Sequence, residues 1–167
     1  MSEDVPASLR PPVELALAKV ADAVPAEGAL PGGCLYEPKW DGYRLSISVG
    51  AGGASLWSRQ GKDLSRYFPE LLRAAEAQIP PGCVLDGEAV IWTAGRLDFD
   101  ALQKRLVTAH SALPALARKS PASFAAFDLL AVAGHDIRGT PLAGRRLAPA
   151  AESLTRNQGT QRGADLA

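Results

Sequence analysis

The sequence has 167 residues, of which 47% are hydrophobic and 22% charged, a length and composition typical of one globular domain with its own core. Its 18 basic and 18 acidic residues cancel, so any attraction to nucleic acid or to an anionic membrane must come from a local patch of charge. Two cysteines exclude a disulfide framework, and without a signal peptide or a long apolar run we expect a cytoplasmic protein with no membrane partner.

The N-terminal part of the chain is interrupted by prolines and glycines. Residues 1–12 contain three prolines and are predicted to be an extended leader. An amphipathic helix is predicted over 13–22, followed by a loop over 25–33. Residues 34–37 are predicted to form a strand that ends just before Lys39, so that this lysine leaves the core and faces a cleft.

The next segment predicts a hairpin. Asp41 and Gly42 form a turn, and residues 43–49 alternate apolar and polar side chains as a strand does. A glycine cluster then turns the chain into a returning strand over 54–59. The end of that strand is expected to deliver Arg59 to the neighbourhood of Lys39.

The central part alternates helices and apolar strands, which are predicted as helix 69–79, strand 83–92, helix 99–107, a loop or broken helix over 108–120, and strand 123–132. Asp98 is predicted to cap the second helix. The acids Asp86 and Glu88 lie in a strongly apolar strand, where carboxylates are costly unless they meet a cation or a donor.

The C-terminal part changes in character after Gly134. A helix is predicted to begin near residue 141, but Pro149 falls within its expected interior and would break it. Residues 155–167 are polar and short of large apolar groups, and we expect them to be disordered. Residues 13–154 are therefore the predicted domain.

Lys39 is the candidate nucleophile. A lysine attacks as the free amine, which desolvation by apolar neighbours such as Trp40 favours. Asp41 could orient that amine or a ribose hydroxyl, and Gly42 lets the backbone approach a ligand closely. Taken alone, Lys39 also fits an ordinary surface lysine at a strand end.

Four further residues fit a nucleotide site. Arg44 and Arg59 are suited to bidentate contacts with phosphate oxygens. Glu88 could hold a ribose or Mg²⁺, which prefers carboxylate and phosphate oxygens. Phe127 lies on the last apolar strand. Each also fits an ordinary role, as a solvated strand residue, an ion-pair partner or a core aromatic.

Several motifs together resemble the adenylation domain of bacterial ATP-dependent DNA ligases. They are YEPKWDGYR, SRQGKDLSRYFPEL, VLDGEAVIW, AFDLL and PLAGRRL, in this order, between about Pro11 and Leu147. The resemblance implies an α+β nucleotidyltransferase fold (ATP-grasp-like) in which antiparallel sheets are flanked by helices. We expect this fold to be incomplete in the present chain.

The resemblance also implies residue roles. Lys39 is implied to form a phosphoramide bond to AMP, expelling pyrophosphate from ATP with the help of Mg²⁺. The other implied positions are Glu37 at the adenine amine, Asp41 and Gly42 beside the lysine, Arg44 and Arg59 at ribose and phosphate, Glu88 at ribose or the metal ion, and Phe127 stacked on adenine.

Two later motifs of the family, a Glu-Gly and a Lys-x-Lys, do not occur after Phe127. The resemblance also implies an oligonucleotide-binding domain that closes over the nucleotide, and we expect it to be missing. We therefore expect a truncated, monomeric DNA ligase that uses ATP and nicked double-stranded DNA in repair, recombination or replication, with weak or absent nick sealing. The alternatives are an RNA ligase, an mRNA-capping guanylyltransferase, or an inert remnant that binds nucleotide or DNA.

Overall fold

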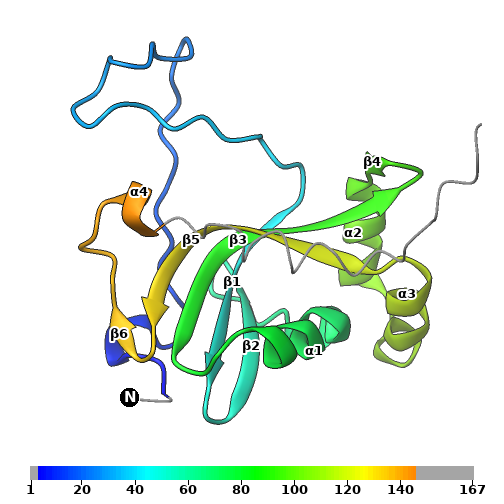
Figure 1. The fold of residues 1–167 in the computed structure, drawn as a ribbon. Helices are drawn as coiled ribbons and strands as arrows, with labels where there is room; N and C mark the ends of the chain where they lie inside the picture. Colours follow the sequence, from blue (N-terminus) through cyan, green and yellow to red (C-terminus); the bar gives the residue numbers. More distant parts are fainter. Residues whose placement is uncertain (1–3, 146–167) are drawn as a thin grey trace, which may run out of the picture.

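One antiparallel sheet organises the structure, a computed structural model that describes residues 4–145. Within these residues the strand order is β2-β1-β3-β5-β6, and β4 pairs with β3 outside this path. The strands are β1 (Tyr43–Gly50), β2 (Gly53–Ser58), β3 (Cys83–Thr93), β4 (Arg96–Leu97), β5 (Ala122–Val132) and β6 (His135–Asp136). The long strands β3 and β5 run through the middle of the molecule (Figure 1).

Helices cover one side and one end of this sheet. They are α1 (Pro69–Gln78), α2 (Phe99–Val107), α3 (Leu113–Lys119) and α4 (Leu142–Arg145), with short 3-10 turns η1 (Ala7–Leu9), η2 (Ser65–Tyr67) and η3 (His110–Ala112). Helix α1 lies beside β1 and β2, whereas α2 and α3 lie at the far end of β3 and β5 (Figure 1). No helix in the described part is long and apolar enough to span a bilayer.

The main core forms where alternate side chains of the strands meet α1. Leu45 and Leu56 are fully buried there against Phe68 and Ala75. Helix α2 begins at Asp98, whose Oδ1 accepts a hydrogen bond of 2.9 Å from the backbone N–H of Ala101, as the sequence predicts. The strands β1, β2, β3 and β5 and helices α1 and α2 thus confirm the predicted elements to within one or two residues at each end.

Part of the opposite face of the sheet is covered by the N-terminal segment. Val5, Leu9, Val13 and Leu15 are buried against residues of β3 and β5. The predicted helix over 13–22 is wrong, because Val13 and Leu15 are buried two residues apart along an extended backbone. The leader is likewise not extended throughout, since η1 lies within it.

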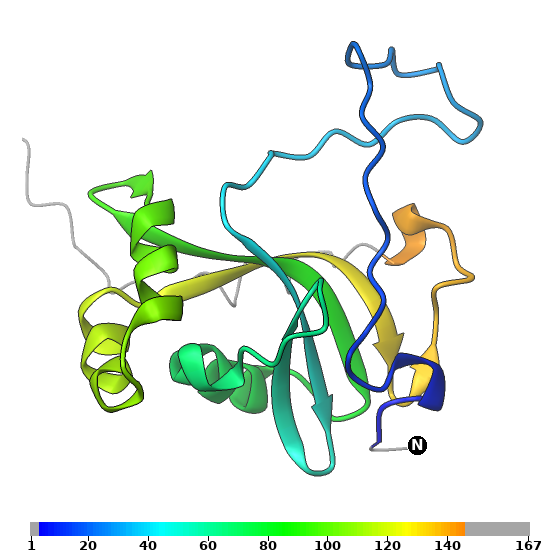
Figure 2. The ribbon, with the colours of Figure 1, turned by 180° about the vertical axis from the view of Figure 1, so that it is seen from behind.

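A long connection, residues 16–42, then leaves the sheet and returns to β1 (Figure 2). The strand predicted over 34–37 is wrong, because these residues are not paired with any described strand and Tyr36 is about half exposed. Residues 108–120 contain η3 and α3, which matches the predicted broken helix. The tail predicted to be disordered, residues 155–167, lies outside the described residues, as does most of the helix predicted after residue 141.

Candidate active site

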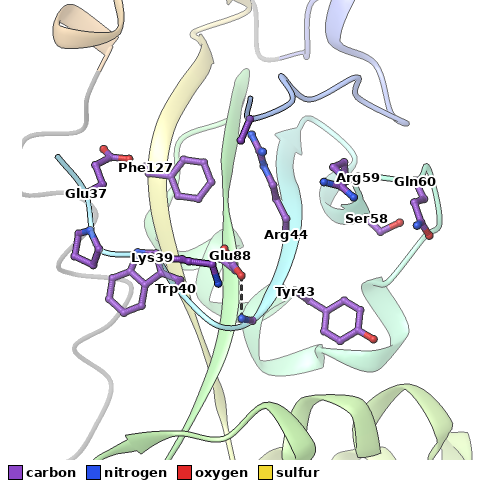
Figure 3. Close-up of a pocket in the computed structure, with 13 residues that line it drawn as sticks. Glu37, Lys39, Trp40, Tyr43, Arg44, Ser58, Arg59, Gln60, Glu88 and Phe127 are labelled. Atoms are coloured by element: carbon purple, nitrogen blue, oxygen red, sulfur yellow. Dashed lines mark hydrogen bonds between the residues drawn. The ribbon is translucent and has the colours of Figure 1, made fainter. Parts of the chain in front are cut away.

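A pocket of about 550 Å³ opens at one end of β1. It is lined by Ala18, Glu37, Pro38, Lys39, Trp40, Gly42, Tyr43, Arg44, Ser58, Arg59, Gln60, Glu88 and Phe127. In Figure 3, Glu37 and Phe127 lie on one side of the view, the Ser58–Gln60 turn lies on the other, and Lys39 and Glu88 lie between them. The pocket therefore gathers residues from five separate stretches of the sequence.

Lys39 lies on the connection just before β1 rather than at a strand end. Its side chain is exposed at the pocket. The next residue, Trp40, is half-buried and meets Trp92 of β3 in an edge-to-face contact with ring centroids 6.4 Å apart. This aromatic pair ties the segment that carries Lys39 to the sheet.

Glu88 is held at the turn into β1. The backbone N–H of Gly42 donates a hydrogen bond of 2.9 Å to Glu88 Oε1, which is the dashed line in Figure 3. A Cβ at Gly42 would lie 2.2 Å from the carbonyl oxygen of Ala89, so only glycine allows this close approach to β3. Burial raises the pKa of Glu88 above its ordinary value, although the Gly42 N–H and the charges of Lys39 and Arg44 partly oppose this.

Arg44 lies across the same face of the sheet as Glu88. Its Nη2 and Nε donate to the two carboxylate oxygens of Asp86, at 2.7 and 3.2 Å. This bidentate contact raises the pKa of Arg44, so its positive charge is fixed at the pocket. Burial raises the pKa of Asp86, while Arg44 opposes that effect. The two acids of β3 thus meet a cation and a donor respectively, as the sequence analysis requires.

Phe127 enters the pocket because β5 is irregular at this point. Asp128 pairs with Asp86 and Ala126 pairs with Gly87, so Phe127 is an extra residue without a partner on β3. Such a bulge redirects a side chain. The Phe127 ring lies 5.4 Å from the guanidinium carbon of Arg44, and the neighbouring Asp128 pairs with Arg145 of α4.

The third wall is the turn after β2. Ser58 accepts a hydrogen bond of 3.0 Å from the Lys62 N–H through its Oγ, which closes the turn. The Arg59 N–H donates to the carbonyl oxygen of Arg44 at 3.4 Å. The turn therefore brings Arg59 to the pocket, as predicted, with an exposed side chain.

Seven of the eight predicted site residues line the pocket: Glu37, Lys39, Gly42, Arg44, Arg59, Glu88 and Phe127. Asp41 does not, and its side chain is exposed. The sequence placed the turn with Ser58 and Gln60 near Lys39 without a role for either, and it did not predict Tyr43 at the pocket or Asp86 as the partner of Arg44. The signal for that pair was present, because an acid and an arginine occur on adjacent apolar strands.

The described residues contain no group of three side chains arranged to hold a metal ion. Glu88 supplies one of the two carboxylates that line the pocket, the other being that of Glu37. A carboxylate oxygen suits an ion such as Mg²⁺ when substrate phosphates complete its coordination.

Comparison with known proteins agrees with this geometry. Residues 16–154 match the family described as ATP dependent DNA ligase domain. DNA ligase C of Mycobacterium tuberculosis is 45% identical over 138 residues, which are 83% of this chain and 37% of that protein. DNA ligase C1 of Mycolicibacterium smegmatis is 43% identical over 142 residues, 83% of this chain and 40% of that protein.

Solved structures give the same result. The structure titled mycobacterial DNA ligase D complexed with ATP and MES is 35% identical to this chain, with a TM-score of 0.55 over 71% of this chain and 36% of that one. Fold and pocket define a nucleotidyltransferase-type adenylation domain. More narrowly, this chain belongs to the ATP-dependent DNA ligase domain family. It spans about two-fifths or less of the length of these relatives.

Proposed function

We propose that this chain carries out the first step of DNA ligation, the transfer of AMP from ATP to Lys39. The observation that carries this proposal is the convergence of Lys39, Glu88 and Phe127, from three distant segments, on one pocket of nucleotide size. A relative of similar fold was solved in complex with ATP. Family membership supports the same chemistry.

In this reaction the unprotonated amine of Lys39 attacks the α-phosphorus of ATP. A phosphorus–nitrogen bond forms, the bond to the bridging oxygen breaks, and pyrophosphate leaves with the electron pair of that bond. The amine gives up a proton to solvent. Arg44 and Arg59 neutralise charge on the phosphates, and Phe127 stacks on adenine beside Glu37. Asp41 lies outside the pocket lining, and its proposed role is to orient the lysine amine or a ribose hydroxyl.

Glu88 is the residue that would hold Mg²⁺, together with phosphate oxygens of the nucleotide. When bound, Mg²⁺ neutralises the charge that develops on the leaving pyrophosphate. Glu88 itself keeps one oxygen on the Gly42 N–H, so the same side chain orients the turn and presents its other oxygen to the pocket.

The later steps follow from the same proposal. AMP passes to the 5′-phosphate of nicked double-stranded DNA, and the neighbouring 3′-hydroxyl then displaces it to seal the strand. Nick sealing is a step of DNA repair, and replication and recombination need the same chemistry. We expect the chain to act as a monomer. We also expect a higher activity in the first step than in nick sealing.

Incubation with α-labelled ATP and Mg²⁺ tests the first step. We expect a covalent protein–AMP adduct at Lys39, identified by mass spectrometry of the digested protein and lost in Lys39→Ala. Lys104→Ala is the matched control, because Lys104 is an exposed lysine on α2 outside the pocket. An adduct from GTP in place of ATP would indicate a capping-type enzyme, and no adduct with either nucleotide would refute the proposal.

A further inference from the structure

Two exposed cations lie at the sheet edge next to the pocket, where the described chain gives them no acidic partner. Lys62 and Arg66 both follow β2, and neither forms an ion pair with any residue between 4 and 145. Five other arginines in the described part form ion pairs. Arg44, for example, pairs with Asp86, and Arg105 pairs with Glu70.

The backbone that carries these cations is fixed to β2. The Ser58 N–H donates to the carbonyl oxygen of Lys62 at 2.8 Å, and the Leu64 N–H donates to that of Leu56 at 2.8 Å. The Leu56 N–H donates in turn to Ser65 Oγ at 3.0 Å. Residues 62–65 therefore lie along the free edge of the sheet and do not move independently of it.

The side chains are held as well. Lys62 Nζ lies 5.7 Å and the guanidinium carbon of Arg66 4.6 Å from the ring centroid of Tyr67. Arg66 also donates a hydrogen bond to the Tyr67 hydroxyl. Both charges are thus gathered at one aromatic ring, which reduces the side-chain freedom that binding a ligand would otherwise remove.

The acid between them, Asp63, forms no ion pair with either cation. Asp63 Oδ1 accepts a hydrogen bond of 2.8 Å from the Ser65 N–H, which commits that oxygen to the local turn. The exposed Arg59 of the pocket rim lies three residues before Lys62. The segment from the pocket rim to η2 therefore carries three exposed positive charges, two of them held at Tyr67, and one negative charge.

We propose that Lys62 and Arg66, held against Tyr67, bind backbone phosphates of the duplex DNA whose nick lies at the pocket. Duplex DNA presents a regular row of phosphates, and a guanidinium and an ammonium suit such oxygens. A chain without net charge needs a local patch of this kind to bind DNA. The proposal rests on DNA being the substrate of the proposed function.

The test is binding of the 167-residue chain to a fluorescein-labelled nicked duplex, measured by anisotropy at several KCl concentrations. The variant is Lys62→Gln with Arg66→Gln, which keeps side-chain stems over Tyr67. We expect weaker binding and a plot of log K against log salt whose slope is shallower by about two. Lys104→Gln with Arg118→Gln is the matched control, because it removes one exposed lysine and one exposed arginine from α2 and α3. Its slope should equal that of the wild type.

A charge-preserving variant, Lys62→Arg with Arg66→Lys, should keep the wild-type slope and so shows that charge is what matters. An unchanged slope in the glutamine variant, equal losses in both glutamine variants, or no salt-dependent binding by the wild-type chain would overturn the inference. The ATP adduct is measured in parallel and should be unchanged in every variant. An adduct without the slope difference refutes only the DNA surface, whereas the slope difference without an adduct refutes only the proposed adenylation.

Discussion

At the scale of single residues, Glu88 combines a structural and a chemical role that one substitution separates. Glu88→Gln keeps an oxygen that accepts the Gly42 N–H and removes the negative charge. We expect adduct formation to fall about 10–100-fold while the fold is kept, a loss similar to that of removing a group that orients a metal ligand. The measurement is the rate of adduct formation with labelled ATP, beside a thermal melt.

The pH dependence of adduct formation gives a second test of the role of Glu88. Burial raises the pKa of Glu88, so its carboxylate is lost as pH falls through a value above that of an ordinary glutamate. The acid limb of the wild-type rate should therefore lie above the usual glutamate range, and Glu88→Gln should lack it. Because the raised pKa makes the charged form unfavourable in the fold, the variant should be at least as stable as the wild type at neutral pH. A variant with the wild-type acid limb contradicts this role.

Gly42 is required by the closeness of two backbones. An added Cβ would lie 2.2 Å from the carbonyl oxygen of Ala89, and a strand backbone cannot easily withdraw. We expect Gly42→Ala to destabilise the fold by about 1–3 kcal/mol, measured by urea denaturation. The control is Gly28→Ala, because nothing lies within 4 Å of a Cβ at Gly28. Equal stability of the two variants would show that the approach is looser than the structure has it.

At the scale of elements, the position of Lys39 depends on the contact between two segments. Trp92, near the end of β3, meets Trp40 edge-to-face and is itself 39% exposed, so its removal opens little of the core. We expect Trp92→Ala to slow adduct formation about 2–10-fold, in line with the ~0.5–1.5 kcal/mol of such a pair, with only a small change in melting temperature. Trp92→Phe should recover most of the rate. Val107→Ala, at an exposed position of α2, is the neutral control, and an unchanged rate in Trp92→Ala would exclude this support.

The sequence predicts correctly those elements whose apolar residues recur at a spacing that fits only a helix or only a strand. Strand β1 alternates from Tyr43 onward, and α1 starts at a proline with its apolar face at helical spacing. Residues 13–22 admit two interpretations, because Val13, Leu17 and Val20 recur at helical spacing whereas Val13 and Leu15 recur at strand spacing. Only packing on the second face of the sheet decides between them. The bulge that turns Phe127 into the pocket has no signature in the sequence at all.

At the scale of the whole molecule, the candidate site could be predicted because its motifs occur in order along the chain. What could not be predicted is how the site is supported. The pairing of Arg44 with Asp86, and of Asp128 with Arg145, depends on strand register and on where α4 lies. Tertiary structure sets these partners. The motifs in the sequence therefore identify the residues of the site, whereas the ion pairs that hold those residues are seen only in the fold.

The same holds for Arg105, whose side chain is fully buried where the helical end of the molecule meets the main core. Its guanidinium donates to the carbonyl oxygens of Tyr67 and Ser120, at 3.0 and 2.6 Å, and pairs with Glu70 at 2.8 Å. It therefore joins η2, α1 and the end of α3. Removing it leaves a largely buried carboxylate without its cation, which is costly because that charge remains desolvated.

We expect Arg105→Met to lower the free energy of unfolding by about 3–5 kcal/mol, measured by urea denaturation. Adding Glu70→Gln should restore part of this loss, because the buried charge is removed while an acceptor for the Ala122 N–H remains. Arg73→Met, at an exposed position of α1, is the control and should change stability little. A double variant as unstable as Arg105→Met alone would show that the lost stability comes from the two hydrogen bonds to carbonyl oxygens. The ion pair between Arg105 of α2 and Glu70 of α1 would then not be what stabilises the packing of these helices.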